Sequence, residues 1–161
     1  MQIVLTKLTD ERHALEVLRA DGSRERVELE TRSVLFHDFT HFALEQAARI
    51  ERGFFGALAA GATLRQLSGR AGESAPDYDG ERLQIERAVA VLQGLAKAPQ
   101  DPAALHARIV QMLAIQEETP PAWFTVELVQ QVAERLRQLV GEWKATRHGS
   151  SLELFWTKVG R

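Results

Sequence analysis

The period of the hydrophobic pattern changes twice along this chain, and those changes limit the fold more than any other feature. Residues 2–8 are rich in β-forming residues. Residues 12–19 and 24–30 alternate between apolar and polar side chains, which is typical of strands with one buried face. Between these two segments, the sequence ADGS predicts a hairpin turn, because glycine tolerates the positive φ that such turns require. The chain therefore begins with two or three antiparallel strands.

The pattern becomes helical from about residue 34 to residue 60, a stretch without proline. At ~100° per residue its main apolar residues fall within an arc of about 80°, and Thr31 or Ser33 could cap its start. We therefore expect one long helix, which Gly53 and Gly56 could bend or open to close approach by another backbone. Three further helices are expected from the same periodicity, over about residues 81–97, 102–116 and 125–147.

The tail, residues 151–157, alternates again, with Leu152, Leu154 and Trp156 on one side. A lone C-terminal strand needs a partner for its backbone groups, and we expect it to pair with an N-terminal strand. The expected fold class is α+β, a small antiparallel sheet of the N-terminal strands and the C-terminal strand packed against about four helices. Residues 68–80 are rich in glycine and small polar residues and predict a loop inside a single domain of residues 1–161.

Composition narrows the classes of function. The chain has 161 residues, of which 45% are hydrophobic and 26% charged, as in one globular domain. Its 20 basic and 22 acidic residues give a formal net charge of -2, which argues against nucleic acid or an anionic membrane as a partner. No apolar stretch approaches the ~20 residues of a membrane span, and the N-terminus lacks signal-peptide features, so we expect a soluble, cytoplasmic protein. The sequence carries no signature of a particular oligomeric state.

The stretch HDFTHFALE places His37, His41 and Glu45 at positions i, i+4 and i+8 of the long predicted helix. At ~100° per residue these side chains project from one stripe about 80° wide. We expect all three to face a common cavity and not open solvent, because ionisable groups that lose water need partners in its place. The stripe is shared with three apolar residues, Leu44, Ala48 and Phe55.

The two histidines have the spacing of the zinc-binding H-E-x-x-H helix, in which imidazoles at i and i+4 reach one ion. The chain has no cysteine, so any metal must be held by histidines and carboxylates. On this interpretation His37, His41 and Glu45 hold a divalent metal, zinc or a similar ion. Asp38 occupies the place of the motif's general base, and we expect it to act on a water molecule or to hold a ligand histidine in one tautomer. The leading hypothesis is a His/carboxylate metal-binding protein with the chemistry of a metal-dependent hydrolase.

Two other interpretations stay open. The same residues could form a metal-free polar cluster in a non-catalytic domain that binds a small-molecule ligand or another protein. They could also be structural histidines paired with Asp38, Glu45 or Arg49. The doublet His37-Asp38 also occurs in metal-dependent phosphohydrolases, but that family needs an upstream histidine on a helix, and His13 lies in a predicted strand.

The ADGS turn, the charged strand after it and the run HDFTHFALEQAARIERGFFGALAAG together resemble a group of small uncharacterised bacterial proteins. Those proteins have a similar ADGS turn, an H-D-x-x-H-x-x-x-E helix start and an aromatic-glycine stretch further on. The resemblance covers roughly residues 20–61, with a weaker likeness from Gly149 to Trp156. It implies that the two histidines and two acids of this stretch form one unit, and it implies no particular activity.

Overall fold

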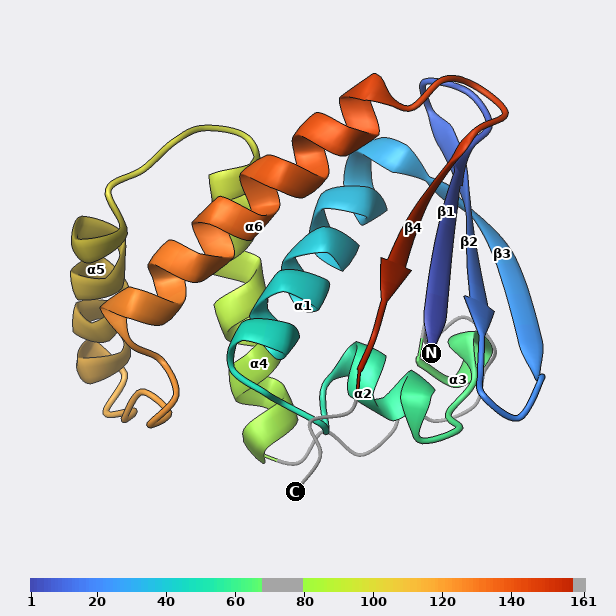
Figure 1. The fold of residues 1–161 in the computed structure, drawn as a ribbon. Helices are drawn as coiled ribbons and strands as arrows, with labels where there is room; N and C mark the ends of the chain where they lie inside the picture. Colours follow the sequence, from blue (N-terminus) through green and yellow to red (C-terminus); the bar gives the residue numbers. More distant parts are fainter. Residues whose placement is uncertain (68–79, 158–161) are drawn as a thin grey trace.

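Four strands form an antiparallel sheet in the order β3-β2-β1-β4 (Figure 1). The first three, β1 (Gln2–Lys7), β2 (Arg12–Leu18) and β3 (Arg24–Glu30), follow one another as hairpins. β4 (Ser151–Phe155) returns from the other end of the chain to pair with β1, and Ile3 lies opposite Leu154. The predicted pairing of the C-terminal segment with an N-terminal strand is confirmed, and so is the α+β fold class.

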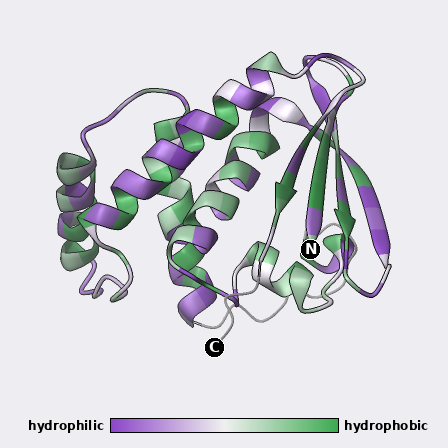
Figure 2. Cartoon of the chain, viewed as in Figure 1, coloured by the Kyte–Doolittle hydropathy of each residue, from purple (hydrophilic) through white to green (hydrophobic). Residues whose placement is uncertain are grey.

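The longer helices stand on one side of this sheet, and α5 is the farthest from it (Figure 1). The computed structural model describes residues 1–67 and 80–157, so the predicted loop over 68–80 lies, apart from its last residue, outside the described residues. Figure 2 shows hydrophilic and hydrophobic residues following one another along α6, as an amphipathic sequence requires. The helical elements are η1 (Thr31–Leu35, a π-helix), α1 (Phe36–Ala47), α2 (Phe54–Ala59), α3 (Leu64–Leu67), α4 (Gly80–Leu92), η2 (Gln93–Ala96, a 3-10 helix), α5 (Pro102–Ile115) and α6 (Val126–Ala145).

The prediction of one long helix over residues 34–60 is wrong. The chain leaves the α1 helix after Ala47, and Arg49 adopts a positive φ of 56° before α2 begins at Phe54. Gly53 permits the close packing at this break, because a Cβ there would collide with the carboxylate of Glu45. The predicted capping by Thr31 or Ser33 is also not found, since the turn before α1 is a π-helix and α1 has no side-chain cap.

The core lies between the sheet and the helices. Alternate residues of β1 and β2, among them Leu5, Leu15 and Val17, are buried against it. Trp156, just after β4, is also buried and stacks on Phe55 with a centroid distance of 6.0 Å. Among the described residues, no helix has the length and apolar character needed to cross a membrane.

Candidate metal centre

A cavity of about 670 Å³ lies between the β2–β3 half of the sheet and the helices α1 and α4. Its polar residues come mainly from the helices, where α1 supplies His37, Asp38 and His41 and α4 supplies Glu86. The sheet side is mainly apolar. The two histidines are placed together because residues four apart on a helix share one face, and Glu86 is added by the packing of α4 on α1.

Three ligating atoms converge at this end of the cavity. His41 Nε2 lies 3.2 Å from His37 Nε2 and 3.3 Å from Glu86 Oε2, and His37 Nε2 lies 3.9 Å from the same oxygen. A tetrahedral zinc ion with bonds of about 2.0–2.1 Å keeps its ligand atoms about 3.3 Å apart. Because the three distances are close to that value, His37, His41 and Glu86 could hold a metal ion.

His41 is the buried member of this group, and a carboxylate on its far side fixes the orientation of its ring. Its side chain is 2% exposed, and its Nδ1 lies 2.9 Å from Glu45 Oε1. A nitrogen this close to a carboxylate oxygen carries the proton and donates it, which leaves the lone pair on Nε2 when the ring is neutral. Nε2 is the atom that faces His37 and Glu86. The carboxylate behind the ring therefore selects the tautomer that a metal ligand needs.

Glu45 does not face the cavity, and the expectation that it shares one with His37 and His41 is wrong. Its carboxylate is fully buried and accepts hydrogen bonds from the backbone N–H groups of Phe54 (2.7 Å), Phe55 (3.0 Å) and Gly56 (3.2 Å). These amides form the first turn of α2, where free N–H groups and the helix dipole favour a negative charge. The break between α1 and α2 thus turns Glu45 away from the atoms that could hold a metal ion, and Glu86 stands there in its place.

Asp38 lines the cavity beside His37 and is 6% exposed. Its Oδ2 is buried and has no hydrogen-bond partner among the residues that the structure describes. Burial raises the pKa of this carboxyl to about 7, against a smaller lowering by the charge of His41. A carboxylate in this condition is a natural acceptor for a proton from a bound molecule, which fits its predicted position as a base.

The two histidines differ in their affinity for protons. Burial lowers the pKa of His41, but hydrogen bonds and charges from Glu45 and Glu86 outweigh it and raise the pKa to about 9. Burial and the charge of His41 lower the pKa of His37 below its ordinary value. The hydrogen bond and charge of His41 also outweigh the effect of burial on Glu86 and lower its pKa. In the metal-free protein, a proton on His41 therefore occupies the place where a cation would bind.

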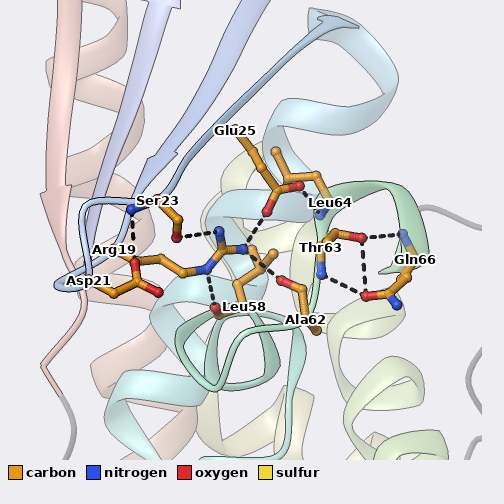
Figure 3. A network of polar contacts seen from close by, with 9 residues as sticks. All are labelled: Arg19, Asp21, Ser23, Glu25, Leu58, Ala62, Thr63, Leu64 and Gln66. Atoms are coloured by element: carbon orange, nitrogen blue, oxygen red, sulfur yellow. Dashed lines mark hydrogen bonds and ion pairs between the residues drawn. The ribbon is translucent and has the colours of Figure 1, made fainter.

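A second polar network joins the β2–β3 turn to α2, α3 and the segment between them (Figure 3). Arg19 pairs with Glu25 at 2.5 Å and donates to the backbone carbonyls of Leu58 (2.8 Å) and Ala62 (2.7 Å). Glu25 in turn accepts from the backbone N–H of Leu64 at 2.9 Å, at the start of α3. This network ties the segment between α2 and α3 to the hairpin, and so positions Glu25 and Leu64 as lining residues.

Sequence reasoning missed Glu86. Its only signal is a carboxylate beside the apolar residues Ile85 and Val89 on an amphipathic helix, and many surface acids share that pattern. No spacing rule links it to α1, because Glu86 lies 45 residues after His41 in the chain and the two helices meet only through tertiary packing. The position of Glu86 is therefore information that only the folded structure contains.

The chain was also compared with known proteins. No protein-family model, no curated protein and no solved structure matches it.

Proposed function

We propose that this protein binds a divalent metal ion through His37, His41 and Glu86 and that it acts as a metal-dependent hydrolase. The observation that carries the proposal is the convergence of two imidazole nitrogens and one carboxylate oxygen, all within 4.8 Å of one another, at one end of a cavity. Three protein ligands leave a coordination position open, as in catalytic and not in structural zinc sites. Zinc is the expected ion, because two imidazoles and one carboxylate are among its usual catalytic ligand sets.

The remaining groups of the site have separate roles in this proposal. A divalent ion held here would lower the pKa of a water molecule and so supply a nucleophile near neutral pH. Asp38 takes the proton from that water, because its buried Oδ2 has no partner among the described residues. Glu45, first expected to be a ligand, orients His41 from behind through Nδ1.

A second candidate function is a non-catalytic binding domain with a metal-free polar cluster. One observation favours it: protonated His41 is already satisfied by carboxylates on both sides, Glu45 at 2.9 Å and Glu86 at 3.3 Å. Such a cluster would hold α1, α2 and α4 together without any ion. The two functions differ in whether a cation displaces the proton of His41.

Calorimetric titration of metal-stripped, tag-free protein with zinc, nickel and manganese tests the proposal. We expect one ion per chain at pH 7.5, with release of a proton that makes the heat depend on the buffer, and weaker binding at pH 5.5. Glu86→Gln should weaken binding, and the double variant His37→Ala/His41→Ala should abolish it. His148→Ala is the matched control, because His148 is exposed and pairs with Asp10 on the surface.

Each result has a defined meaning. Equal affinity in the wild type and the double variant would show that the ion binds elsewhere, and the metal-site proposal would be wrong. If Glu86→Gln binds the ion as tightly as the wild type, Glu86 is not the third ligand, and another carboxylate must take that position. Binding without hydrolysis of any ester or amide by the zinc-loaded protein would leave the binding-domain function.

A further inference from the structure

The cavity is much larger than an ion and one water need. Its volume of about 670 Å³ lies in the range of about 300–1,000 Å³ that is usual for small-molecule sites. The end with the metal-ligating residues occupies only the side formed by α1 and α4. The rest of the space is bounded by the sheet, by η1 and by α3.

The wall opposite the metal-ligating residues is apolar and comes from several elements. Leu15 and Val27 are partners across β2 and β3, so their side chains stand next to each other on the inner face of the sheet. Phe54 lies at the polar end, with its ring 5.7 Å from that of His41. The apolar lining residues on this wall are Leu15, Val27, Leu29, Val34, Leu64 and Leu67.

The charged residues on the β3 side of the cavity are engaged with other protein groups. Glu25 is held by Arg19 and by the backbone of Leu64, and Arg26 pairs with Glu28 at 3.4 Å. This side is therefore apolar apart from these paired side chains. Arg65 of α3 and Arg82 of α4 also line the cavity, and each interacts with other protein groups. The cavity has one polar end that suits an oxygen ligand and one apolar wall that suits a hydrocarbon body.

We infer that the substrates are esters or amides whose acyl part is an apolar chain or aryl group. The carbonyl oxygen lies at the end with His37, His41 and Glu86, and the acyl chain lies against the β2–β3 wall at Val27. Water adds to the carbonyl carbon and the bond to the alcohol or amine breaks. The carboxylic acid product keeps the oxygen of the water molecule. The alcohol or amine leaves with a proton that Asp38 passes on from that water. This inference rests on the proposed metal site.

Binding of straight-chain hydroxamates to the zinc-loaded protein tests this inference, because these compounds carry an oxygen-rich metal-binding head on a chain of chosen length. We expect the affinity to rise from acetohydroxamate to octanohydroxamate by about fourfold per added methylene while the wall is being covered. Val27→Thr should weaken octanohydroxamate severalfold and leave acetohydroxamate unchanged. The matched control is Val4→Thr, on β1 of the same sheet, which does not line the cavity.

The outcomes separate the two proposals. If zinc binds as expected but the affinity does not depend on chain length, the apolar substrate class is wrong and the metal site stands. An equal effect of Val27→Thr and Val4→Thr would also overturn the placement of the chain on this wall. If zinc does not bind, the metal site and the substrate class are both wrong, and the zinc titration shows this without any hydroxamate.

Discussion

Glu45 is completely buried, and its two oxygens accept hydrogen bonds from His41 and from three backbone amides of α2. Glu86 is the opposite kind of carboxylate, since it is half-buried and faces the cavity. Both lie within hydrogen-bonding reach of one imidazole ring, on its two sides. At the scale of single residues, the chemistry of the site therefore depends on which oxygen meets which nitrogen of His41.

Replacing Glu45 with Gln tests its role as the residue that orients His41. The variant keeps the size of the side chain but loses the charge, and its NH2 group cannot accept from a backbone amide. We expect zinc affinity to fall by about 10–100-fold, as for other residues that hold a ligand histidine. The control is Glu51→Gln, an exposed carboxylate in the turn between α1 and α2, which should bind zinc like the wild type. Calorimetry at pH 7.5 measures both, and equal affinities would contradict the assigned role.

The buried side chain of His13 should lower the free energy of unfolding in acid. It is 0% exposed, with Nδ1 3.2 Å from Thr31 Oγ1, and burial lowers its pKa to about 4. In the unfolded chain its pKa is about 6.5, so between these values only the unfolded state takes up the proton. The free energy of unfolding should therefore fall as the pH falls, with about 2 kcal/mol from His13 between pH 7 and pH 5.

The difference between wild type and His13→Asn isolates this contribution, because Asp38 and the histidines of the site titrate in both proteins. Asn does not titrate and keeps a polar atom near Thr31. Urea unfolding of metal-free protein at pH 7 and pH 5 should show a smaller loss of stability in the variant. A loss as large in the variant as in the wild type would mean that His13 does not cause it.

At the scale of elements, the break between α1 and α2 creates the group of backbone amides that holds Glu45 behind His41. It brings the first turn of α2 against the last turn of α1, so that the amides of Phe54, Phe55 and Gly56 surround Glu45. A continuous helix would have used those amides for its own backbone hydrogen bonds. Two close approaches permit the break, that of Gly53 to Glu45 and that of Gly56 to the backbone of Glu51.

Gly53→Ala should destabilise the protein, because the new Cβ collides with the Glu45 carboxylate, which is hydrogen-bonded on all sides and cannot move freely. We expect a cost of about 1–3 kcal/mol and weaker zinc binding. Gly141→Ala is the control and should change stability in the other direction. A Cβ there, within α6, meets nothing within 4 Å, and alanine favours a helix interior by roughly 0.5–1 kcal/mol. Denaturant unfolding measures the free energy of unfolding of both variants. If both variants were destabilised, or both stabilised, the role given to Gly53 would be contradicted.

At the scale of the whole molecule, the two ends of the chain close the structure. Met1 and Trp156 exchange hydrogen bonds between backbone groups at 3.0 Å and 2.9 Å, and β4 adds the edge strand beside β1. Trp156 also meets Phe42 and Phe55 at centroid distances of 6.1 Å and 6.0 Å. The C-terminal segment thus supports the same turn of α2 that holds Glu45.

Deletion of residues 150–161 should abolish cooperative unfolding, because the core loses Leu154 and Trp156 together with the partner strand of β1. A pair of point variants makes the test sharper. Trp156→Ala should cost about 3–5 kcal/mol, since Trp156 is 6% exposed, whereas Phe155→Ala should cost far less, since Phe155 is 61% exposed. Thermal or denaturant unfolding measures all three, and an unchanged transition in the truncated protein would contradict the prediction.

Elements with an unambiguous hydrophobic period could be predicted from the amino-acid sequence. The strands and the helices after residue 80 were predictable, because alternation and helical periodicity are local properties of the chain. That the C-terminal strand pairs with an N-terminal strand was predictable because a lone strand needs a partner, but the choice of β1 was not. The pairing of His37 with His41 was predictable for the same reason, since four residues bring side chains to one face of a helix. The position of Asp38 next to His37 predicted that it lies in the site. The sequence did not predict that its Oδ2 is buried with no hydrogen-bond partner among the described residues.

The carboxylate that lies beside the two histidines could be identified only in the folded protein. The apolar stripe continues through residues 48–53, so local periodicity favours a continuous helix, and the break follows from the hydrogen bonds that Glu45 gains with α2. Glu86 comes from a helix far along the chain, and its place depends on how α4 packs on α1. Contacts of this kind depend on the sum of many packing interactions across the core, and no spacing within one segment encodes them.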